Sequence, residues 1–445
     1  MSDTNRRDFL KHSSKTALAA GLLGGIQSGA FAAGDDTIRV GLVGCGGRGS
    51  GAAKQALSTD GNVKLVAMGD AFIERLDDSL GSLQKAFESQ PGRVAVDEDH
   101  KFVGLDAYRK VIDSEIDLVI LATPPGFRPT HFEYAVEKGR HVFMEKPVAV
   151  DAPGVRQVLD AAEKAKAQQL KVGVGLQRRY LNSYLYIVPR IHDGEIGDLV
   201  SLRVYWNSGG VWDPRRTRDQ VRTEMEYQLW GWYYFNWLCG DHICEQHIHN
   251  LDVGVWLKQQ YPVKARGMGG REVRTDKMYG EIFDHHEVEY TFDDGTVMLS
   301  TCSHMANCYH DVSEHAVGTK GTVDLANNSS PKGNRITLYS GDAYAYRGEN
   351  PDPYQVEHDV LFAAIREGLS HNEADYGANS TMTSILGRMC TYSGKEITWE
   401  EALNHGARVT PENMADLTFD STPPVLPDSD GWYQVPVPGL TPVLA

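Results

Sequence analysis

Apolar segments alternate with amphipathic segments between residues 38 and 176. Continuous apolar or β-branched runs are typical of buried parallel strands, and they occur at 38–43, 64–68, 117–122, 141–144 and 171–176. Apolar positions at helical spacing predict helices at 52–57, 72–89, 107–112, 131–138 and 155–166. Strands that alternate with helices predict an α/β fold with a doubly wound parallel sheet, whose ligands bind at the carboxyl ends of the strands.

After residue 177 the continuous apolar runs give way to alternation of apolar and polar positions. This period of two is typical of strands with one buried face, here at 199–205, 285–292, 296–302, 313–317 and 335–339. Asp293-Asp294-Gly295 predicts a hairpin turn between two of these strands. Helices are predicted at 243–257, 355–367 and 381–389. We therefore expect a second domain built on an antiparallel sheet.

A glycine loop joins the first strand to the first helix. Its G-x-G-x-x-G pattern predicts a tight turn, close approach of a pyrophosphate and close packing of helix on strand. The helix N-terminus offers N–H groups to phosphates. Asp70 ends the second strand, where a carboxylate binds the ribose hydroxyls of NAD and repels the 2′-phosphate of NADP. The predicted NAD site includes Gly44, Cys45, Gly46, Gly47, Arg48, Gly49 and Asp70.

Two further segments follow strands of the same predicted sheet. Thr123, Pro124 and Pro125 follow one strand, and Glu145 and Lys146 follow the next. Because the carboxyl ends of parallel strands meet at one edge, we expect all five residues at the cofactor site. Lys146, fixed by the following proline, would point its ammonium toward the nicotinamide. The alternative is a surface lysine in a loop.

The segment 239–252 has the sequence CGDHICEQHIHNLD. In the predicted helix, Glu245, His249 and Asp252 lie at i, i+4 and i+7 and share one face. A carboxylate one turn from a histidine can orient the imidazole and raise its basicity, as a general base requires. A metal interpretation of His242, His247 and His249 and a buried structural role for His247 are the alternatives. Residues two apart on a helix face different directions, and we predict no metal site.

The N-terminus carries an export signal. Arg6 and Arg7 lie in the sequence NRRDFLK, followed by a mild apolar run at 17–26 and a small-residue cleavage site at 30–32. This is the pattern of a twin-arginine signal, with a short amphipathic helix as the alternative. The predicted organisation is a signal peptide at 1–33, an NAD-binding domain at 34–176, a C-terminal substrate and oligomerisation domain at 177–405, and a Pro-rich arm at 406–445. We expect a periplasmic or otherwise exported protein that is not integral to the membrane once mature.

Charge and cysteine content narrow the class further. Sixty Asp and Glu residues against 44 Lys and Arg give no basic footprint for nucleic acid. Cys302 and Cys308 flank a strand end and could pair, since export makes disulfides possible. The arm holds many prolines and is expected to pack over its own domain or to reach a neighbouring subunit.

Taken together, these motifs resemble the glucose–fructose oxidoreductase/inositol dehydrogenase (Gfo/Idh/MocA) family. The resemblance rests on the glycine loop, Glu145-Lys146-Pro147, the residues at 177–180, the Glu245/His249/Asp252 spacing and the turn at 318–321, and it spans about 38–403. It implies a Rossmann domain followed by a C-terminal α/β domain on a large, mainly antiparallel sheet. The open face of that sheet commonly mediates oligomers, so a homodimer or homotetramer is expected.

The resemblance also implies residue roles. Lys146 would bind the reacting hydroxyl beside the nicotinamide, and His249 would be the catalytic base. Glu245 stands where the family usually has Asp, and His247 where Gly is frequent, which leaves the substrate geometry open. Arg178 and Tyr180 would line the boundary between cofactor and substrate. In the aromatic segment 226–237, Trp232 and Tyr233 could stack on a sugar face, or be core or interface residues.

The predicted function is that of an exported NAD-dependent oxidoreductase acting on the CH–OH group of a sugar, glycoside or cyclitol. NAD is scarce outside the cytoplasm, so the cofactor would be held tightly, with a Kd on the order of nanomolar. The first alternative is a redox-neutral, NAD-dependent glycosidase that works by oxidation and elimination. The second is a sugar-binding protein without catalysis. The twin-arginine translocase is the expected export partner.

Overall fold

The computed structural model describes residues 36–326 and 334–445. Its N-terminal sheet has six parallel strands in the order β3-β2-β1-β4-β5-β6. The strands are β1 Ile38–Val43, β2 Val63–Asp70, β3 Lys101–Val103, β4 Leu118–Leu121, β5 His141–Met144 and β6 Val172–Val174. The strand order reverses at β1, which opens a crevice at the carboxyl ends of β1 and β4. The predicted doubly wound parallel sheet is confirmed.

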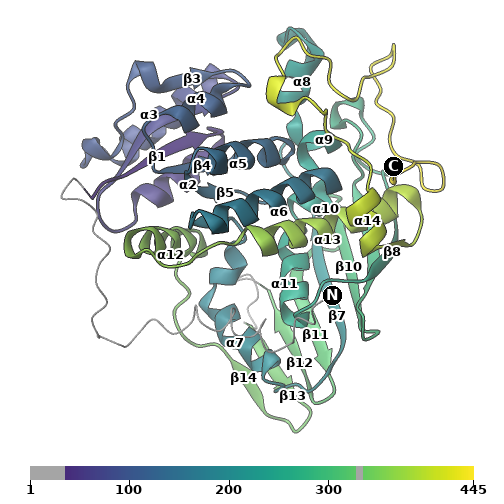
Figure 1. Cartoon of the computed structure of the whole chain (residues 1–445). Coiled ribbons are helices and arrows are strands. Elements are labelled where there is room, and N and C mark those ends of the chain that lie inside the picture. The colour runs from purple at the N-terminus through teal and green to yellow at the C-terminus, as the bar shows by residue number, and fades with distance from the viewer. Residues whose placement is uncertain (1–35, 327–333) are drawn as a thin grey trace. The chain divides into compact units, whose positions relative to one another are not determined.

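Helices cover both faces of this sheet (Figure 1). They are α2 Gly47–Leu57, α3 Ile73–Ala86, α4 Ala107–Asp113, α5 Arg128–Glu137, α6 Ala152–Ala167 and α12 Pro353–Glu367. Side chains of α2, α3 and α12 share one apolar cluster with Leu118 and Ile120 of β4. Those of α4, α5 and α6 share another with Val119 and Leu121. The alternation along β4 separates the two faces, as the pleat of a strand requires.

A second sheet carries nine strands in the order β14-β13-β12-β11-β7-β10-β9-β8-β15. They are β7 Leu199–Ser208, β8 Lys264–Gly270, β9 His285–Thr291, β10 Val297–His304, β11 Asp311–Gly318, β12 Gly321–Leu325, β13 Arg335–Leu338, β14 Ala343–Ala345 and β15 Ile397–Thr398. The β10–β7 pair is parallel, and the other pairs are antiparallel. The expected mainly antiparallel sheet is therefore confirmed.

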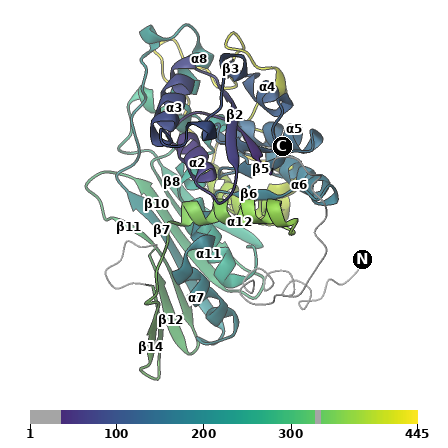
Figure 2. The ribbon, with the colours of Figure 1, turned by 90° about the vertical axis from the view of Figure 1, so that its left-hand side faces the viewer.

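The C-terminal part also contains seven of the helices that the structure describes. They are α7 Asn182–His192, α8 Glu224–Trp230, α9 Asn236–Cys239, α10 His242–Glu245, α11 Ile248–Lys258, α13 Ala374–Ser393 and α14 Trp399–His405. Helix α11 packs on β7 and β11 (Figure 2). Helix α13 packs on β8 and β9. Val200, Met268 and Leu299 are exposed large apolar residues on β7, β8 and β10.

The single helix predicted at 243–257 is wrong, because the chain forms α10 and α11 with a break at Gln246 and His247. The His247 N–H donates to the carbonyl of His242, five residues back, which widens the turn. The His247 side chain is buried and lies 2.8 Å from the Ser300 hydroxyl. This break changes which residues of the segment face the same way.

The C-terminal residues 406–445 pack over their own chain, running past α8 (yellow in Figure 1). Gln228 of α8 donates to the carbonyl of Val425 at 2.7 Å. Met414, Leu417 and Tyr433 share an apolar cluster with residues of α8 and α9. The tail is thus part of the cluster that lies beside the predicted site.

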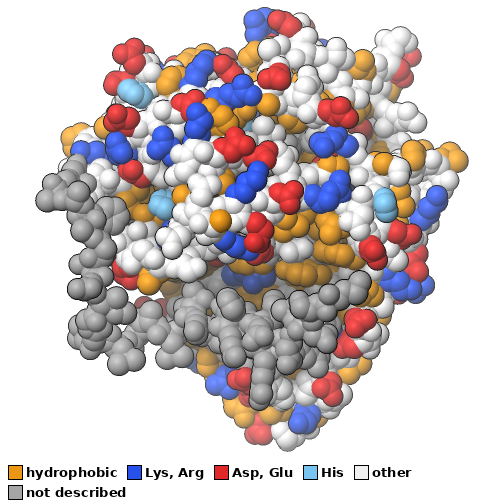
Figure 3. Space-filling view, viewed as in Figure 1, with side chains coloured by type: hydrophobic (Ala, Val, Ile, Leu, Met, Phe, Trp, Pro, Cys, Tyr) orange, Lys and Arg blue, Asp and Glu red, His pale blue; other side chains and the backbone are white. Residues whose placement is uncertain are grey.

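No helix within 36–326 or 334–445 combines the length and apolar character that crossing a membrane requires. The predicted signal at 1–33 lies outside the described residues. Figure 3 shows Lys and Arg side chains interspersed with Asp and Glu over the part of the face that is not grey. All six cysteines are free, with Cys302 buried and Cys308 exposed, so the considered Cys302–Cys308 pair does not form.

Candidate active site

A cavity of about 580 Å³ lies at the carboxyl ends of the strands of the N-terminal sheet. Its walls include the glycine loop after β1, Asp70 at the end of β2, Thr123–Pro125 after β4, and Glu145 and Lys146 after β5. The C-terminal part adds Glu245, Gln246 and His249. Segments that are far apart in the chain thus meet in one cavity, as the strand-end argument predicts.

The backbone of the glycine loop fits a dinucleotide. Gly44 has φ +93°, and a Cβ there would lie 2.6 Å from the backbone of Ala122. A Cβ on Gly49 would lie 1.9 Å from the Gly44 carbonyl oxygen, so α2 can approach β1 only with glycine there. A Cβ on Gly46 would meet no protein atom within 4 Å. The open space at Gly46, next to the uncapped start of α2, suits a pyrophosphate.

Asp70 is held in place by the loop that it faces. Its Oδ2 accepts from the Cys45 N–H at 2.6 Å, and its Oδ1 from the Phe72 N–H at 2.9 Å. Burial raises the pKa of Asp70, and these two N–H donors oppose that effect. Each oxygen keeps a lone pair for a ribose hydroxyl.

Cys45, predicted as part of the NAD site, belongs to the glycine loop but does not line the cavity. Its side chain is buried, with Sγ 3.5 Å from the Gly69 carbonyl, and only its neighbours in the loop line the cavity. The neighbouring Arg48 does line it, and its Nε donates to Glu145 Oε1 at 2.5 Å. The Arg48 guanidinium also lies 4.6 Å from the centre of the Tyr354 ring.

Lys146, Glu245 and His249 form the reactive corner of the cavity. The Lys146 Nζ donates to the Glu245 carbonyl at 2.5 Å and lies 3.7 Å from Glu245 Oε1. Burial raises the pKa of Glu245 to about 7, although Lys146 and Arg128 oppose the rise. Burial, together with Lys146 and Arg178, holds the pKa of His249 well below its usual value, so its imidazole is neutral. The corner therefore contains an ammonium, a carboxyl group that ionises near neutral pH, and a neutral imidazole.

The predicted pairing of Glu245 with His249 is wrong, because the break between α10 and α11 changes the facing of the two side chains. His249 Nδ1 and Glu245 Oε2 are buried without a hydrogen-bond partner, while Glu245 Oε1 faces Lys146. Asp252 leaves the site altogether: it accepts from Arg179 at 2.8 Å and from the Ser380 hydroxyl at 2.7 Å. Both residues line the cavity, and neither of these two atoms makes a hydrogen bond within the protein.

Of the two residues predicted at the boundary of cofactor and substrate, Arg178 lines the cavity and Tyr180 does not. Both lie in the 3₁₀ helix Gln177–Tyr180, in which successive side chains point in different directions. Arg178 pairs with the buried Glu314. The Tyr180 hydroxyl donates to Glu373, away from the cavity.

The same geometry separates the two predicted sugar-stacking residues. Trp232 lines the cavity, whereas Tyr233 is buried against His304 with ring centroids 5.7 Å apart. They are consecutive in the 3₁₀ helix Trp232–Tyr234, so they cannot face the same way. Tyr233 is a core residue, the alternative considered from the sequence.

Several cavity residues were not found from the sequence. Phe72 follows Asp70 and stacks on Trp230 of α8 with centroids 4.2 Å apart. Trp206 of β7 lies 6.0 Å from the His249 ring, nearly parallel to it. Tyr108, Trp212, Arg215 and Tyr354 also line the cavity. The position of Phe72 just after Asp70 was a usable signal, but the others come from loops and strands whose approach to the cavity depends on tertiary packing.

This fold and cavity define the chain as an oxidoreductase with an NAD-binding Rossmann domain. Residues 38–174 match the Gfo/Idh/MocA family model, described as "Oxidoreductase family, NAD-binding Rossmann fold". The resemblance inferred from the sequence motifs is therefore confirmed over the NAD-binding domain.

Relatives and solved structures agree with this assignment. The chain is 25% identical over 341 residues to inositol 2-dehydrogenase of Rhizobium meliloti, a match that covers 75% of this chain and 90% of the relative. It is 28% identical over 166 residues to a glycosyl hydrolase family 109 protein of Shewanella pealeana, covering 37% of this chain and 34% of the relative. Scyllo-inositol dehydrogenase from Lactobacillus casei, solved with NAD(H) and scyllo-inositol, has the same fold at 20% identity, with a TM-score of 0.61 and coverage of 82% and 99%.

Proposed function

We propose that the chain is an exported NAD-dependent oxidoreductase that transfers hydride between a hydroxyl-bearing carbon of a sugar, glycoside or cyclitol and a tightly held NAD. The convergence of Lys146, Glu245 and His249 at one corner of the dinucleotide cavity is the observation that carries the proposal. The names of the inositol dehydrogenases among its relatives support a polyol substrate. Trp206 and Trp232 supply flat apolar surfaces on which a sugar ring can stack.

Each group of residues in the cavity has its own role in binding the cofactor or in transferring the proton. The glycine loop and Asp70 would hold NAD, which accepts the hydride when bound. Lys146 donates a hydrogen bond to the reacting hydroxyl oxygen and stabilises its developing negative charge. His249, neutral in the cavity, accepts the hydroxyl proton. Glu245 balances the charge of Lys146 once it is ionised.

Asp70 favours NAD over NADP. Its carboxylate is fixed by two N–H groups at the end of β2, where it would repel a 2′-phosphate. Comparison of the NAD and NADP dissociation constants of wild type and Asp70→Ser tests this. We expect the preference for NAD to fall by at least tenfold in the variant, and an unchanged preference would remove Asp70 from this role.

Export rests on Arg6 and Arg7 with the apolar run and small residues that follow them. In a bacterial host that has the twin-arginine translocase, the wild-type chain should reach the periplasmic fraction. Replacement of both arginines by lysine should leave it in the cytoplasm. Equal periplasmic amounts of both proteins would contradict the proposal.

Retention of the cofactor is tested by denaturing the purified protein and assaying the released nucleotide. Stoichiometric NAD(H) supports a retained cofactor that is regenerated in place. Recovery of empty protein from cells with ample NAD would contradict tight retention.

The His249→Ala variant, with nucleotide content as its control, should lose about 10²–10⁴-fold in hydride transfer. Unchanged turnover would exclude His249 as the base.

A redox-neutral glycosidase is the second candidate, favoured by the partial match to a glycosyl hydrolase family 109 protein. Oxidation of a ring carbon would acidify the neighbouring C–H, and elimination would cleave the glycoside. Water would then add to the resulting carbon–carbon double bond, and the hydride would return to the carbonyl carbon. A carboxyl group with a pKa of about 7, as in Glu245, can give a proton to the leaving group. Aglycone release without net NADH supports this candidate, whereas net NADH on adding a glycoside supports the dehydrogenase. A chain that catalyses neither with any sugar but binds them would be a sugar-binding protein.

A further inference from the structure

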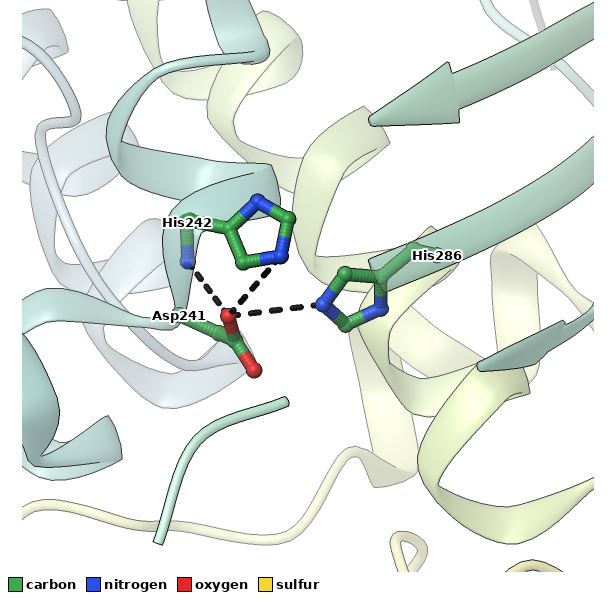
Figure 4. Close-up of side chains that lie close together, drawn as sticks. All are labelled: Asp241, His242 and His286. Atoms are coloured by element: carbon green, nitrogen blue, oxygen red, sulfur yellow. Dashed lines mark hydrogen bonds and ion pairs between the residues drawn. The ribbon is translucent and has the colours of Figure 1, made fainter. Parts of the chain in front are cut away.

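Asp241, His242 and His286 form a buried cluster outside the cavity lining (Figure 4). Asp241 and His242 begin α10, one turn before Glu245, and His286 comes from β9. All three residues are at most 2% exposed. One ligand atom of each residue lies within 4.8 Å of those of the other two. The sequence had suggested His242 with His247 and His249, but the fold brings His242 to Asp241 and His286.

The two imidazoles present nitrogen atoms that no protein group satisfies. The Thr391 hydroxyl lies 2.9 Å from His286 Nδ1 and engages that nitrogen. The other ring nitrogen of His286, Nε2, is buried without a hydrogen-bond partner and faces Asp241 Oδ1 at 3.3 Å. A ligand that binds at this point would satisfy it.

The other oxygen of Asp241 is fully engaged by the protein. Asp241 Oδ2 accepts from the Phe283 N–H at 2.9 Å and from the Tyr392 hydroxyl at 2.6 Å. The backbone of Asp241 has φ +70°, a conformation that is rare for a residue with a side chain. These contacts hold Oδ1 toward the two imidazoles, with His242 Nε2 3.9 Å away.

We propose that Asp241, His242 and His286 bind a divalent transition-metal ion such as Zn²⁺. A proton on His286 would satisfy the pair that His286 makes with Asp241. It would leave both ring nitrogens of His242 buried without a partner, as they are in the structure. A metal ion satisfies all three donors at once, and two imidazoles with one carboxylate form a common donor set for zinc and iron. The Thr391 contact to the second nitrogen of His286 is the kind of outer contact that orients a metal-binding histidine.

The ion would join the start of α10 to β9. Because α10 ends at Glu245, this link would fix the carboxyl group that faces Lys146 without any contact between metal and substrate. The site is thus structural and its ligands are positioning residues. It can be tested independently of the proposed hydride transfer.

Elemental analysis of the purified full chain, grown with added Zn²⁺, tests the site first. About one equivalent of metal per chain is expected. X-ray absorption at the zinc edge should then give nitrogen and oxygen ligands at about 2.0–2.2 Å with no sulfur, which excludes the buried cysteines nearby. After chelation and addition of Co²⁺, visible ligand-field bands should appear. Metal-free wild type with no cobalt bands would overturn the proposal and leave a His286 imidazolium paired with Asp241.

Variants locate the metal in the chain. Asp241→Asn preserves the size and the acceptor of the side chain, and His286→Gln removes the imidazole; each should lower metal content at least tenfold. His358→Gln is the matched control, because His358 is also fully buried with both nitrogens unpartnered but is absent from the cluster. Equal metal content in the cluster variants and wild type would place the ion elsewhere and refute the assignment. If the cluster variants do not fold, the X-ray absorption of wild type still decides.

Discussion

Glu245 makes the reactive corner of the cavity sensitive to the pH of the medium. Its pKa is raised from 4.5 to about 7 because burial penalises its charged form. The folded state therefore holds this proton more tightly than the unfolded state, and the stability that the protonated form contributes is lost as pH rises through about 7. His249 stays neutral over this range and does not titrate there.

We expect kcat/KM for hydroxyl oxidation to rise with pH through an inflection near 7, as Glu245 ionises beside Lys146. In Glu245→Gln the inflection should disappear and the rate should stay at or below the low-pH level of wild type. The pH profiles of the two proteins, measured with saturating NAD, make the comparison. An inflection that persists in Glu245→Gln would assign it to another group.

At the residue scale, the sequence allowed prediction of side chains whose position follows from a strand end. Asp70, Lys146 and the glycines lie in the cavity because each follows a strand of the parallel sheet. Tyr180 and Tyr233 were misplaced because their direction depends on a 3₁₀ turn that no apolar periodicity reveals. The Asp241 cluster was not found because His286 is separated from it by many residues and joins it only through tertiary packing.

Elements were predicted well where their apolar pattern was continuous and poorly where glycine replaced it. Strand β8 has the sequence KARGMGG and was missed. A Cβ on its Gly267 would lie 2.4 Å from the Glu287 carbonyl oxygen, so close strand packing removes the side chains that would have signalled the strand. The α10–α11 break was also missed, since the apolar spacing continues across it.

A substitution at the start of α2 is expected to weaken NAD binding with little effect on the stability of the fold. Gly46→Ala introduces a methyl group that meets no protein atom within 4 Å. The free energy of unfolding should therefore fall by no more than about 1 kcal/mol. The same methyl should obstruct the pyrophosphate and weaken NAD binding at least tenfold, or about 1.4 kcal/mol. Titration calorimetry and urea denaturation measure the two effects.

Gly81→Ala is the matched control, in the middle of α3 with equally open space at the Cβ. It should stabilise the protein by about 0.5–1 kcal/mol and leave NAD binding unchanged. If both variants bound NAD like wild type, the pyrophosphate would not lie at Gly46.

Helix α12 is predicted to stabilise the N-terminal sheet although it belongs to a late part of the chain. Leu361 is fully buried in the cluster with β1 and β4, so Leu361→Ala should cost about 2–5 kcal/mol in urea denaturation. Leu369→Ala, just beyond the helix and half exposed, should change stability by less than about 0.5 kcal/mol. A cost below about 1 kcal/mol for Leu361→Ala would mean that the N-terminal core closes without α12.

At the scale of the whole molecule, we propose that the face of the nine-stranded sheet opposite α11 and α13 joins two copies of the chain. Met268 and Leu299 are exposed there on two strands, and Leu299 lies in register with Arg203 and Glu289. An apolar residue between opposite charges suits a self-complementary dimer contact.

Leu299→Arg should shift the mass of the assembly toward the monomer in light scattering, because it places a third charged side chain beside Arg203 and Glu289. Leu426→Arg, at an exposed position of the tail, should leave the mass unchanged. An assembly of equal mass in wild type and Leu299→Arg would exclude this face as the contact.

The sharing of one core between α12 and the N-terminal sheet has a consequence for the order in which the protein can be completed during synthesis. The ribosome releases β1 to β6 long before Leu361, Phe362 and Ile365, which fill the apolar cluster under β1 and β4. The cluster beside the dinucleotide cavity is completed later still, because it contains Tyr433 of the tail. The apolar core of the N-terminal sheet is therefore complete only after α12 has been synthesised.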